Sequence, residues 1–438
     1  MDAAVKAAPP LWARLVPGVF FFAYLVGTVL LFYFGPWIYA LGPHQGRLVL
    51  FLTAVHVAFA IGYLLGIRGA PQDSRLATRV GTLVLICVAV DLLLLFPTSK
   101  LSTGAWIPHP FTALRHLGDA YTRSLLLREQ TTPYANYARI LASPLLAAAL
   151  PLGVFYWRQL GPATRILFVA SVAGTLALYA AMGANAGIAH WAGLFPWFVV
   201  AGHLAGVQTL SRRVWITLGV IQLATVIVFV VFFGATMIQR AGSFASYGAL
   251  PAISARAKSF SQNPQLAPPR SDVRIAAEGL ASYLTQGYYA VYLSLQEPWV
   301  PTYGVGNSVF LTRQVARLTG DATWLKRAYP ERLASKGWDP YGLWATIYPW
   351  IASDVTFPGT VVVVFLVGFV LARVWIDVLG GRNPFAVAFL GQMLIVLYYF
   401  PAHNKVMHSG EGVVAFLALG GAWLISRRRP PAPRTGRR

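Results

Sequence analysis

The sequence is poor in cysteine and in charge. Its single cysteine, Cys87, lies inside an apolar segment, which excludes an intramolecular disulfide and a cysteine-based metal cluster. Only 11% of the 438 residues are charged, whereas 57% are hydrophobic. A soluble domain has about a quarter of its residues charged. Because so few charges cannot solvate so much apolar surface, the chain is predicted to be a polytopic membrane protein.

Motifs that hold metal ions or nucleotides are also missing. The sequence has neither a histidine pair of the HExxH type nor a DxD-like acidic pair, so we expect no metal site and no cofactor. It has no P-loop and no Rossmann glycine run, which argues against transport driven by ATP.

Acidic residues are scarce too. The 14 Asp and Glu residues stand against 35 Lys and Arg residues, which gives a formal net charge of +21. Such a charge can indicate nucleic-acid binding. Here, however, much of it lies in short loops beside apolar segments, where Lys and Arg orient membrane helices and contact anionic lipids. We therefore expect membrane lipids, and no nucleic acid, among the partners.

Apolar segments long enough to cross a membrane recur along the chain. A hydrocarbon layer about 30 Å thick requires about 20 apolar residues in a helix. Segments of this kind lie at residues 15–37, 48–67, 80–97, 140–157, 164–182, 188–209, 214–238, 356–376, 384–401 and 411–426. The first has full spanning length, which argues against a cleaved signal peptide. The prediction is one all-α integral membrane domain over residues 1–438, with about ten transmembrane helices.

The positions of Arg and Lys orient these helices. Every even-numbered helix is followed by a basic loop, and residues 427–438 form a basic tail. Because positive residues favour the cytoplasmic side, both termini and this tail are predicted to be cytoplasmic. Two long loops, at residues 98–139 and 239–355, then share the outer face.

A tyrosine-rich run at residues 279–296 lies within the larger outer loop. Its uncharged length is marginal for a span, but an eleventh span would place the basic tail outside, against the positive-inside pattern. We therefore predict a helix that lies at the outer interface or re-enters there, with Tyr288 and Tyr289 in contact with substrate. The alternative is an ordinary loop helix packed on the bundle.

Both outer loops are net positive, which implies an anionic partner. The guanidinium group of arginine matches phosphate oxygens in bidentate fashion, so a diphosphate at the outer leaflet is the natural candidate. The alternative for any single arginine is that it is solvated or paired with an acid. Asn307, in a glycine turn at residues 302–308, joins the predicted substrate-binding set. The arginines predicted to bind diphosphate adjoin apolar, glycine-turn or tyrosine-containing elements: Arg123, Arg240, Arg274 and Arg313.

Three outer side chains are candidate catalytic groups, because the attack of a hydroxyl needs a base or an orienting acceptor. Glu278 begins the tyrosine-rich run, Asp354 lies at the mouth of the eighth helix, and His403 lies between the last two helices. An acid at a helix start is equally a cap, so capping is the alternative for Glu278 and Asp354.

Ionisable residues inside the apolar segments are interpreted as structural. Asp91 lies in the third segment, about two turns from the outer face, where a charge is costly and usually paired or near a cavity. We favour a structural partner for Asp91 over a proton relay. His56, His190 and His203 are interpreted as hydrogen-bonded structural residues.

Several short motifs together resemble the Wzy-type polymerases of bacterial O-antigen and exopolysaccharide. A shorter outer loop followed by one large loop late in the chain is also similar to that family. The motifs are LGDAYTRS (117–124), MGANAGI (182–188), YLTQGYY (283–289), TYGVGNSVF (302–310) and IASDVTFPG (351–359).

The resemblance implies a GT-C-like fold in the bacterial inner membrane, with residues 98–139 and 239–355 as periplasmic loops. It implies metal-independent glycosyl transfer, inverting or retaining, that polymerises undecaprenyl-diphosphate-linked oligosaccharide repeat units at the periplasmic face. Outer-loop arginines would hold the diphosphates, and a chain-length regulator protein is an implied partner.

Two alternatives stay open. One is an O-antigen ligase or another lipid-phosphosugar glycosyltransferase, to which His403 and His408 would be suited as bases. The other is not an enzyme but a polysaccharide flippase or transporter. A transporter should have charge at the membrane midplane, whereas this sequence concentrates its polar content outside.

Overall fold

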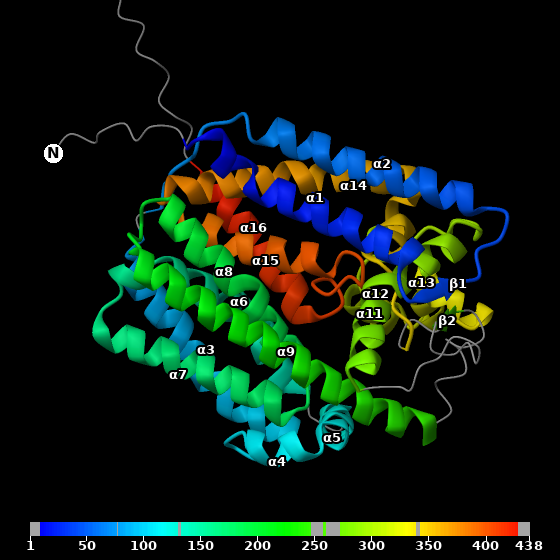
Figure 1. Ribbon diagram of the computed structural model, residues 1–438, viewed down its shortest axis with the longest axis horizontal. Coiled ribbons are helices and arrows are strands. Elements are labelled where there is room, and N and C mark those ends of the chain that lie inside the picture. The colour runs from blue at the N-terminus through cyan, green and yellow to red at the C-terminus, as the bar shows by residue number, and fades with distance from the viewer. Residues whose placement is uncertain are drawn as a thin grey trace, which may run out of the picture.

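The computed structural model describes residues 9–76, 78–129, 133–246, 257–259, 272–338 and 342–427. Within these ranges, only the backbone is described for residues 128–129, 133–135, 237–246, 257–259 and 272–276. The described chain is predominantly helical and forms a bundle of long helices (Figure 1). The prediction of an all-α chain is therefore confirmed apart from one pair of short strands.

A helix is present at each predicted span. Among the described residues, seven helices are long and apolar enough to cross a membrane, as in a multi-pass membrane protein: α1, α2, α3, α6, α7, α9 and α14. The shorter helices α15 and α16 are also apolar. The bounds are α1 (Leu11–Phe34), α2 (Gln45–Gly66), α3 (Val80–Thr103), α6 (Pro133–Phe155), α7 (Pro162–Ala181), α8 (Ala186–Leu204), α9 (Arg212–Ser246), α14 (Ile347–Gly380), α15 (Pro384–Tyr399) and α16 (Gly410–Ser426).

Helices α2 and α14 pack along one another through glycines (Figure 1). A Cβ atom on Gly62 would collide with the carbonyl oxygen of Phe365, and one on Gly368 would collide with the carbonyl oxygen of Phe59. Membrane helices gain little hydrophobic energy by associating in lipid, so small residues that permit close backbone packing decide which helices pair. These two glycines therefore fix the approach of α2 to α14.

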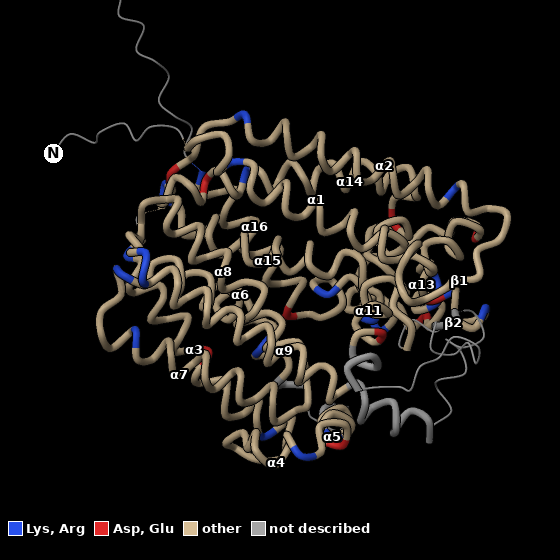
Figure 2. Tube along the Cα trace, in the orientation of Figure 1, with Lys and Arg blue, Asp and Glu red and all other residues tan. Residues whose placement is uncertain are grey.

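The loops divide between the two ends of the bundle. The loops after α2, α6, α8, α14 and α16 lie together at one end, here called the arginine end. Arg158 donates a hydrogen bond to Thr209 at 2.9 Å, and Arg382 donates one to Asp73 at 3.3 Å. The backbones of Arg427 and Ser74 form an isolated antiparallel β-bridge. Figure 2 shows Lys and Arg gathered at this end. It contains the loops that the sequence marks as basic.

The opposite end, here called the loop end, carries the longer connections. Strand β1 (Trp37–Tyr39) pairs antiparallel with β2 (Ala257–Ser259). Helices α11, α12 and α13 cluster beside these strands (Figure 1). The helices of this end are α4 (Pro110–Arg115), α5 (Leu117–Glu129), α11 (Asp272–Ser294), α12 (Val309–Thr319) and α13 (Tyr329–Arg332). In the described part of the chain, the 3-10 helices are η1 (Trp157–Gln159) at the arginine end and η3 (Ala322–Lys326) and η4 (Leu333–Lys336) at the loop end.

The tyrosine-rich run belongs to α11 and is buried in the bundle. Tyr288 is fully buried, and its hydroxyl group forms a 2.8 Å hydrogen bond with Thr28 of α1. Tyr289 is 4% exposed and donates to the carbonyl oxygen of Ala40 at 3.3 Å. The predicted interfacial position is therefore wrong, and the alternative of a helix packed on the bundle is correct. The physical reason is that buried rings with bonded hydroxyl groups gain more from packing than from a wet interface.

Helix α14 is broken near its start. Thr356 has φ 66° and ψ 170°, a conformation that does not occur inside a helix. Pro358 follows, and a proline lacks the N–H group that would continue the backbone hydrogen bonds of the helix. The break separates residues 347–355 from the eighth predicted span, which begins at residue 356. A β-branched residue at positive φ is strained, so the surrounding contacts must hold this break in place.

Candidate functional site

Two neighbouring cavities lie inside the bundle toward the loop end. The first, here called the polar cavity, has a volume of about 550 Å³ and lies among α3, α6, α7, α8, α15 and α16. The second, here called the aromatic cavity, has a volume of about 630 Å³ and lies among α5, α8, α9, α11 and α15. The residues that line both cavities are Tyr179, Met182, His190, Leu194, Ile395 and Lys405. These shared residues form the junction between the cavities.

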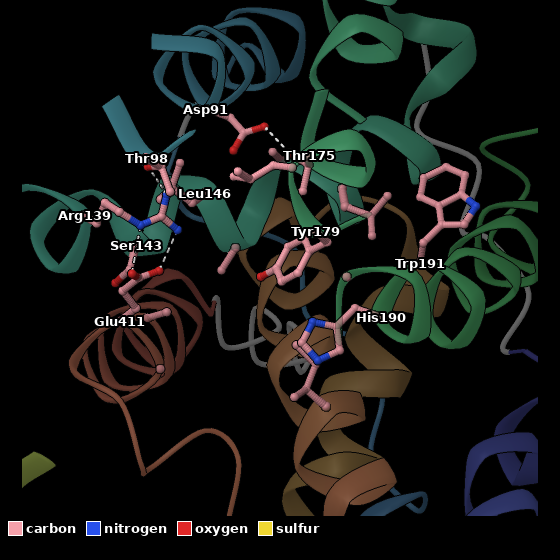
Figure 3. A pocket seen from close by; sticks show the side chains of 18 of the residues that line it. Asp91, Thr98, Arg139, Ser143, Leu146, Thr175, Tyr179, His190, Trp191 and Glu411 are labelled. Carbon is pink, nitrogen blue, oxygen red and sulfur yellow. Dashed lines mark hydrogen bonds and ion pairs between the residues drawn. The ribbon is translucent and has the colours of Figure 1, made fainter. Parts of the chain in front are cut away.

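An ion pair forms one wall of the polar cavity (Figure 3). Arg139 of α6 donates two parallel hydrogen bonds of 2.9 Å to Glu411 of α16 and a third of 2.8 Å to Thr98 of α3. This bidentate geometry is the strongest that an arginine and a carboxylate can adopt. Although the sequence predicts Arg139 in the outer loop at residues 98–139, α6 begins at residue 133 and includes it. Through its contacts with Glu411 and Thr98, Arg139 links α6 to α16 and α3.

A second acidic residue lines the same cavity. Asp91 of α3 accepts hydrogen bonds from Ser171 at 2.5 Å and from Thr175 at 3.3 Å (Figure 3). Both donors lie on one face of α7. Helix α3 continues to Thr103, so Asp91 lies about three turns from the end of the helix, deeper than predicted. The hydroxyl groups of α7 are the structural partners that we expected for this carboxyl group.

His403 lies at the edge of the aromatic cavity, in the loop between α15 and α16. Its ring centroid lies 4.5 Å from that of Trp344 and 4.7 Å from that of His408. Burial, together with the charges of His408 and Lys405, holds the pKa of His403 well below its usual range. Burial and the charges of Lys405 and Arg313 lower the pKa of His408 to about 3. Both rings are therefore neutral at pH 7 and able to accept a proton.

Lys405 brings a positive charge to the junction. It is half-buried, lines both cavities, and is close enough to the two histidines of its loop to depress their pKa values. A lysine ammonium group binds phosphate as a point charge. Lys405 and Glu411 were both missed by the sequence analysis. The available signal was a single cation and a single acid around the short loop that joins the last two helices.

Asp354 is enclosed by the glycine turn. One carboxylate oxygen accepts from the hydroxyl group of Thr302 at 2.5 Å and from the amides of Gly304 and Gly306 at 3.0 and 2.8 Å. The other accepts from the backbone and side-chain amides of Asn307 at 2.9 and 3.0 Å. A carboxylate offers about four acceptor sites, so these five donors occupy it fully. Asp354 and Asn307, predicted as base and substrate ligand, are here a matched pair that holds the turn.

The glycine turn is also hydrogen-bonded to the loop that carries His403. The carbonyl oxygen of Asn307 accepts from the side chain of Asn404 at 2.8 Å, and Ser308 donates to the carbonyl oxygen of Met407 at 2.6 Å. Segments about a hundred residues apart in sequence thus meet beside the cavity junction. Asp354 therefore acts on the candidate site by fixing the position of this loop.

The other predicted catalytic acid lies away from both cavity linings. Helix α11 begins at Asp272, so Glu278 lies in its second turn and is not an N-cap as the alternative supposed. The backbone carbonyl of Glu278 accepts a 2.8 Å hydrogen bond from the indole of Trp37. Of the three predicted catalytic residues, His403 lines the aromatic cavity, whereas Glu278 and Asp354 line neither of the two cavities.

Of the predicted diphosphate ligands, the two arginines whose side chains the structure describes lie on different elements. Arg123 is exposed and lines a smaller pocket of about 410 Å³ beside α4 and α5. Arg313 is exposed on α12, near His408. The side chains of Arg240 and Arg274 lie outside the described part of the chain. Tyr288 and Tyr289, buried in α11, line neither of the two cavities.

Comparisons with models of protein families, with curated proteins and with solved structures give no match for this chain. The candidate site is therefore interpreted from its own geometry.

Proposed function

We propose that the protein is a glycosyltransferase with a GT-C-like fold that polymerises undecaprenyl-diphosphate-linked oligosaccharide repeat units. The observation that carries the proposal is the junction of the two cavities. One short loop provides a cation at the junction, Lys405, and a neutral imidazole in the lining of the aromatic cavity, His403. A sugar attached to a lipid diphosphate combines an anionic group with a reactive carbon. Lys405 can pair with the anionic group, and His403 can act as the base for a hydroxyl group that attacks the carbon.

Lys405 and His403 have distinct roles in the proposed reaction. The hydroxyl group of one repeat unit attacks the anomeric carbon of the chain carried by another lipid. The anomeric C–O bond breaks, and the lipid diphosphate leaves with the bonding electrons. Lys405 stabilises the charge on the leaving diphosphate. His403 takes the proton from the attacking hydroxyl group.

The depressed pKa of His403 fits this order of events. Burial and the nearby charges of His408 and Lys405 disfavour the protonated ring. A diphosphate beside Lys405 offsets that positive charge, which raises the pKa of His403 toward the range in which a base works. The imidazole thus becomes a stronger base only when the donor is bound.

The arrangement of the loops supports the membrane orientation. We propose ten spans with both termini in the cytoplasm, because the arginine end gathers the basic loops that favour this side. The loop end, with the cavity junction, then faces the periplasm of a bacterial inner membrane. Lipid-linked repeat units would be available there.

Deletion of the gene in the source organism tests the proposal. Loss of long surface chains, with single repeat units still transferred, supports a polymerase. Loss of all surface glycan contradicts it and favours a ligase or a flippase. In the deletion strain, Lys405→Met and His403→Gln should each lower polymerisation about a hundredfold or more, whereas Lys405→Arg should retain part of it. Lys326→Met is the matched control, because Lys326 is exposed on η3 and lines no cavity.

A transporter is the second candidate, and one observation favours it. Asp91, Arg139 and Glu411 line a cavity within the bundle, and ionisable groups at membrane depth often mark a route for a polar substrate. If the protein moves the lipid-linked glycan across the membrane, deletion should leave it on the cytoplasmic side. Spheroplasts of the deletion strain, treated with a membrane-impermeant reagent that labels sugars, would then show no labelled glycan lipid.

A further inference from the structure

A continuous wall of aromatic rings lines the aromatic cavity. The rings come from α8, α9, α11 and α15 and from the two segments at residues 344 and 403, which are distant in sequence. Each ring contacts the next in an edge-on or tilted arrangement. Successive centroids lie 5.9 Å apart for Phe229 and Phe233, 5.5 Å for Phe233 and Tyr283, 5.9 Å for Tyr283 and Trp344, 4.5 Å for Trp344 and His403, 5.9 Å for His403 and Tyr399, and 5.7 Å for Tyr399 and His190.

Polar groups line the same cavity. Tyr121, Ser124 and Asn185 lie among its lining residues together with the rings. In addition, a ring nitrogen of His190 and one of His403 are buried without a hydrogen-bond partner among the described residues. The cavity is thus neither a plain apolar slot nor a polar channel.

This mixture decides between two occupants. A polyprenyl chain would cover the two unpartnered ring nitrogens of His190 and His403 without offering a hydrogen bond, and a desolvated polar group without a partner is costly. A sugar ring has apolar C–H faces that pack on aromatic rings and a rim of hydroxyl groups that pair with polar side chains. Pockets of this size typically combine aromatic walls with a few polar groups that fix orientation.

We propose that the aromatic cavity is a saccharide-binding site that holds the terminal sugars of the acceptor. The aromatic wall includes His403, whose loop also carries Lys405, and it ends at His190 in the junction. The identification of this saccharide as the acceptor rests on the proposed function. Binding itself requires no transfer, so it can be measured separately.

The test uses the full-length protein in detergent and a probe without lipid or phosphate. The probe is the oligosaccharide released by mild acid from the lipid-linked repeat units of the source organism. We expect it to bind, as measured by calorimetry, and to change the tryptophan fluorescence because Trp344 forms part of the wall. Phe233→Ala and Tyr283→Ala should each raise the Kd about tenfold, since each removes one stacking ring.

Two kinds of control keep the result interpretable. Phe111→Ala, which removes an exposed ring on α4, and Lys326→Met, which changes an exposed side chain on η3, should both change the saccharide Kd less than twofold. Tyr283→Phe keeps the ring and should recover most of the binding lost in Tyr283→Ala. The variants are compared only where their melting temperatures match that of the unchanged protein, so that a folding defect is not scored as lost binding.

Each outcome bears on one hypothesis. Absence of saccharide binding at millimolar concentrations, or wall variants with an unchanged Kd, would overturn the saccharide site even if deletion abolishes long chains. Displacement of the saccharide by a soluble farnesyl alcohol would assign the cavity to an isoprenoid chain and would overturn it as well. Saccharide binding that needs Phe233 and Tyr283, in a protein whose deletion leaves chain length unchanged, supports the site and contradicts the polymerase.

Discussion

Asn307 holds Asp354 with both of its amide groups, one from the backbone at 2.9 Å and one from the side chain at 3.0 Å. The carboxylate that closes the start of α14 is thereby bonded to the same residue that binds Asn404 beside the candidate site. Asp354, predicted as a catalytic base, is thus bonded to the turn that contacts the loop carrying His403, which is the arrangement of a positioning residue.

Substitution of Asp354 by asparagine tests that role. The carboxamide presents an NH2 group to amide donors that require an acceptor, so at least one donor is left unsatisfied. We expect Asp354→Asn to destabilise the fold by about 2–3 kcal/mol and Thr302→Val, which removes a single donor, by about 1 kcal/mol. Thermal unfolding in detergent measures both. If Asp354→Asn melts with the unchanged protein yet transfers no sugar, Asp354 is a catalytic base instead.

The pair of Arg139 and Glu411 should show strong coupling. Removal of either partner leaves the other charge without its partner, but the side chains are 23% and 39% exposed and solvent screens the charge, so Arg139→Met and Glu411→Leu should each cost about 1–3 kcal/mol. The double variant should cost less than the sum, because it removes both charges. A double-mutant cycle from unfolding midpoints gives the coupling energy. Additive effects would mean that the ion pair contributes nothing beyond its separate side chains.

The glycine contact between α2 and α14 should tolerate no side chain. Gly62→Val would push a side chain into the backbone of α14 at Phe365 and separate the two helices. We expect a strong loss of folded protein, which size-exclusion chromatography of the solubilised membrane fraction would measure. Gly27→Ala in α1 is the control, since a Cβ there meets nothing within 4 Å, and it should be neutral or slightly stabilising. Equal yields of the two variants would contradict this packing argument.

Acid should destabilise the loop that carries His403 and His408. The folded pKa of His408 is about 3, below the value of about 6.5 of an unfolded histidine. Between these values the unfolded chain binds a proton that the folded chain does not, so stability falls as the pH falls below 6.5. The loss should reach roughly 2 kcal/mol at pH 5. Melting temperatures at pH 7.5 and pH 5 check this, and His408→Gln should flatten the difference. Parallel pH profiles for the two proteins would count against the buried neutral ring.

The helices could be predicted from the sequence because the membrane imposes one requirement, a long apolar run, that needs no knowledge of neighbours. The ends of the helices were less predictable. Residues 98–103 and 133–139 contain serine, threonine, lysine and arginine and were assigned to a loop, yet they are helical in α3 and α6. Four of their polar side chains, Thr98, Ser102, Asn136 and Arg139, line an internal cavity, and polarity alone cannot distinguish such a cavity from bulk water.

The candidate site was predictable only where one local segment contains the signal. His403 could be proposed from its position between two late helices. Lys405 and Glu411 gain their roles from residues of other helices, and those contacts arise only when the chain folds. Tyr288 was misplaced for a similar reason, because an amphipathic run packs equally well on a lipid surface or on the protein, and the sequence of the run itself does not say which.

The strained joint at Thr356 has a mechanical consequence. Its backbone lies in a region that glycine adopts freely and that costs other residues about 1–3 kcal/mol, so the bend has a narrow range of angles. Two residues earlier, Asp354 is bonded to the glycine turn; twelve residues later, Gly368 contacts α2. If α14 straightened, Asp354 would be pulled out of its five hydrogen bonds. The loop end and the α2–α14 pair must therefore move together.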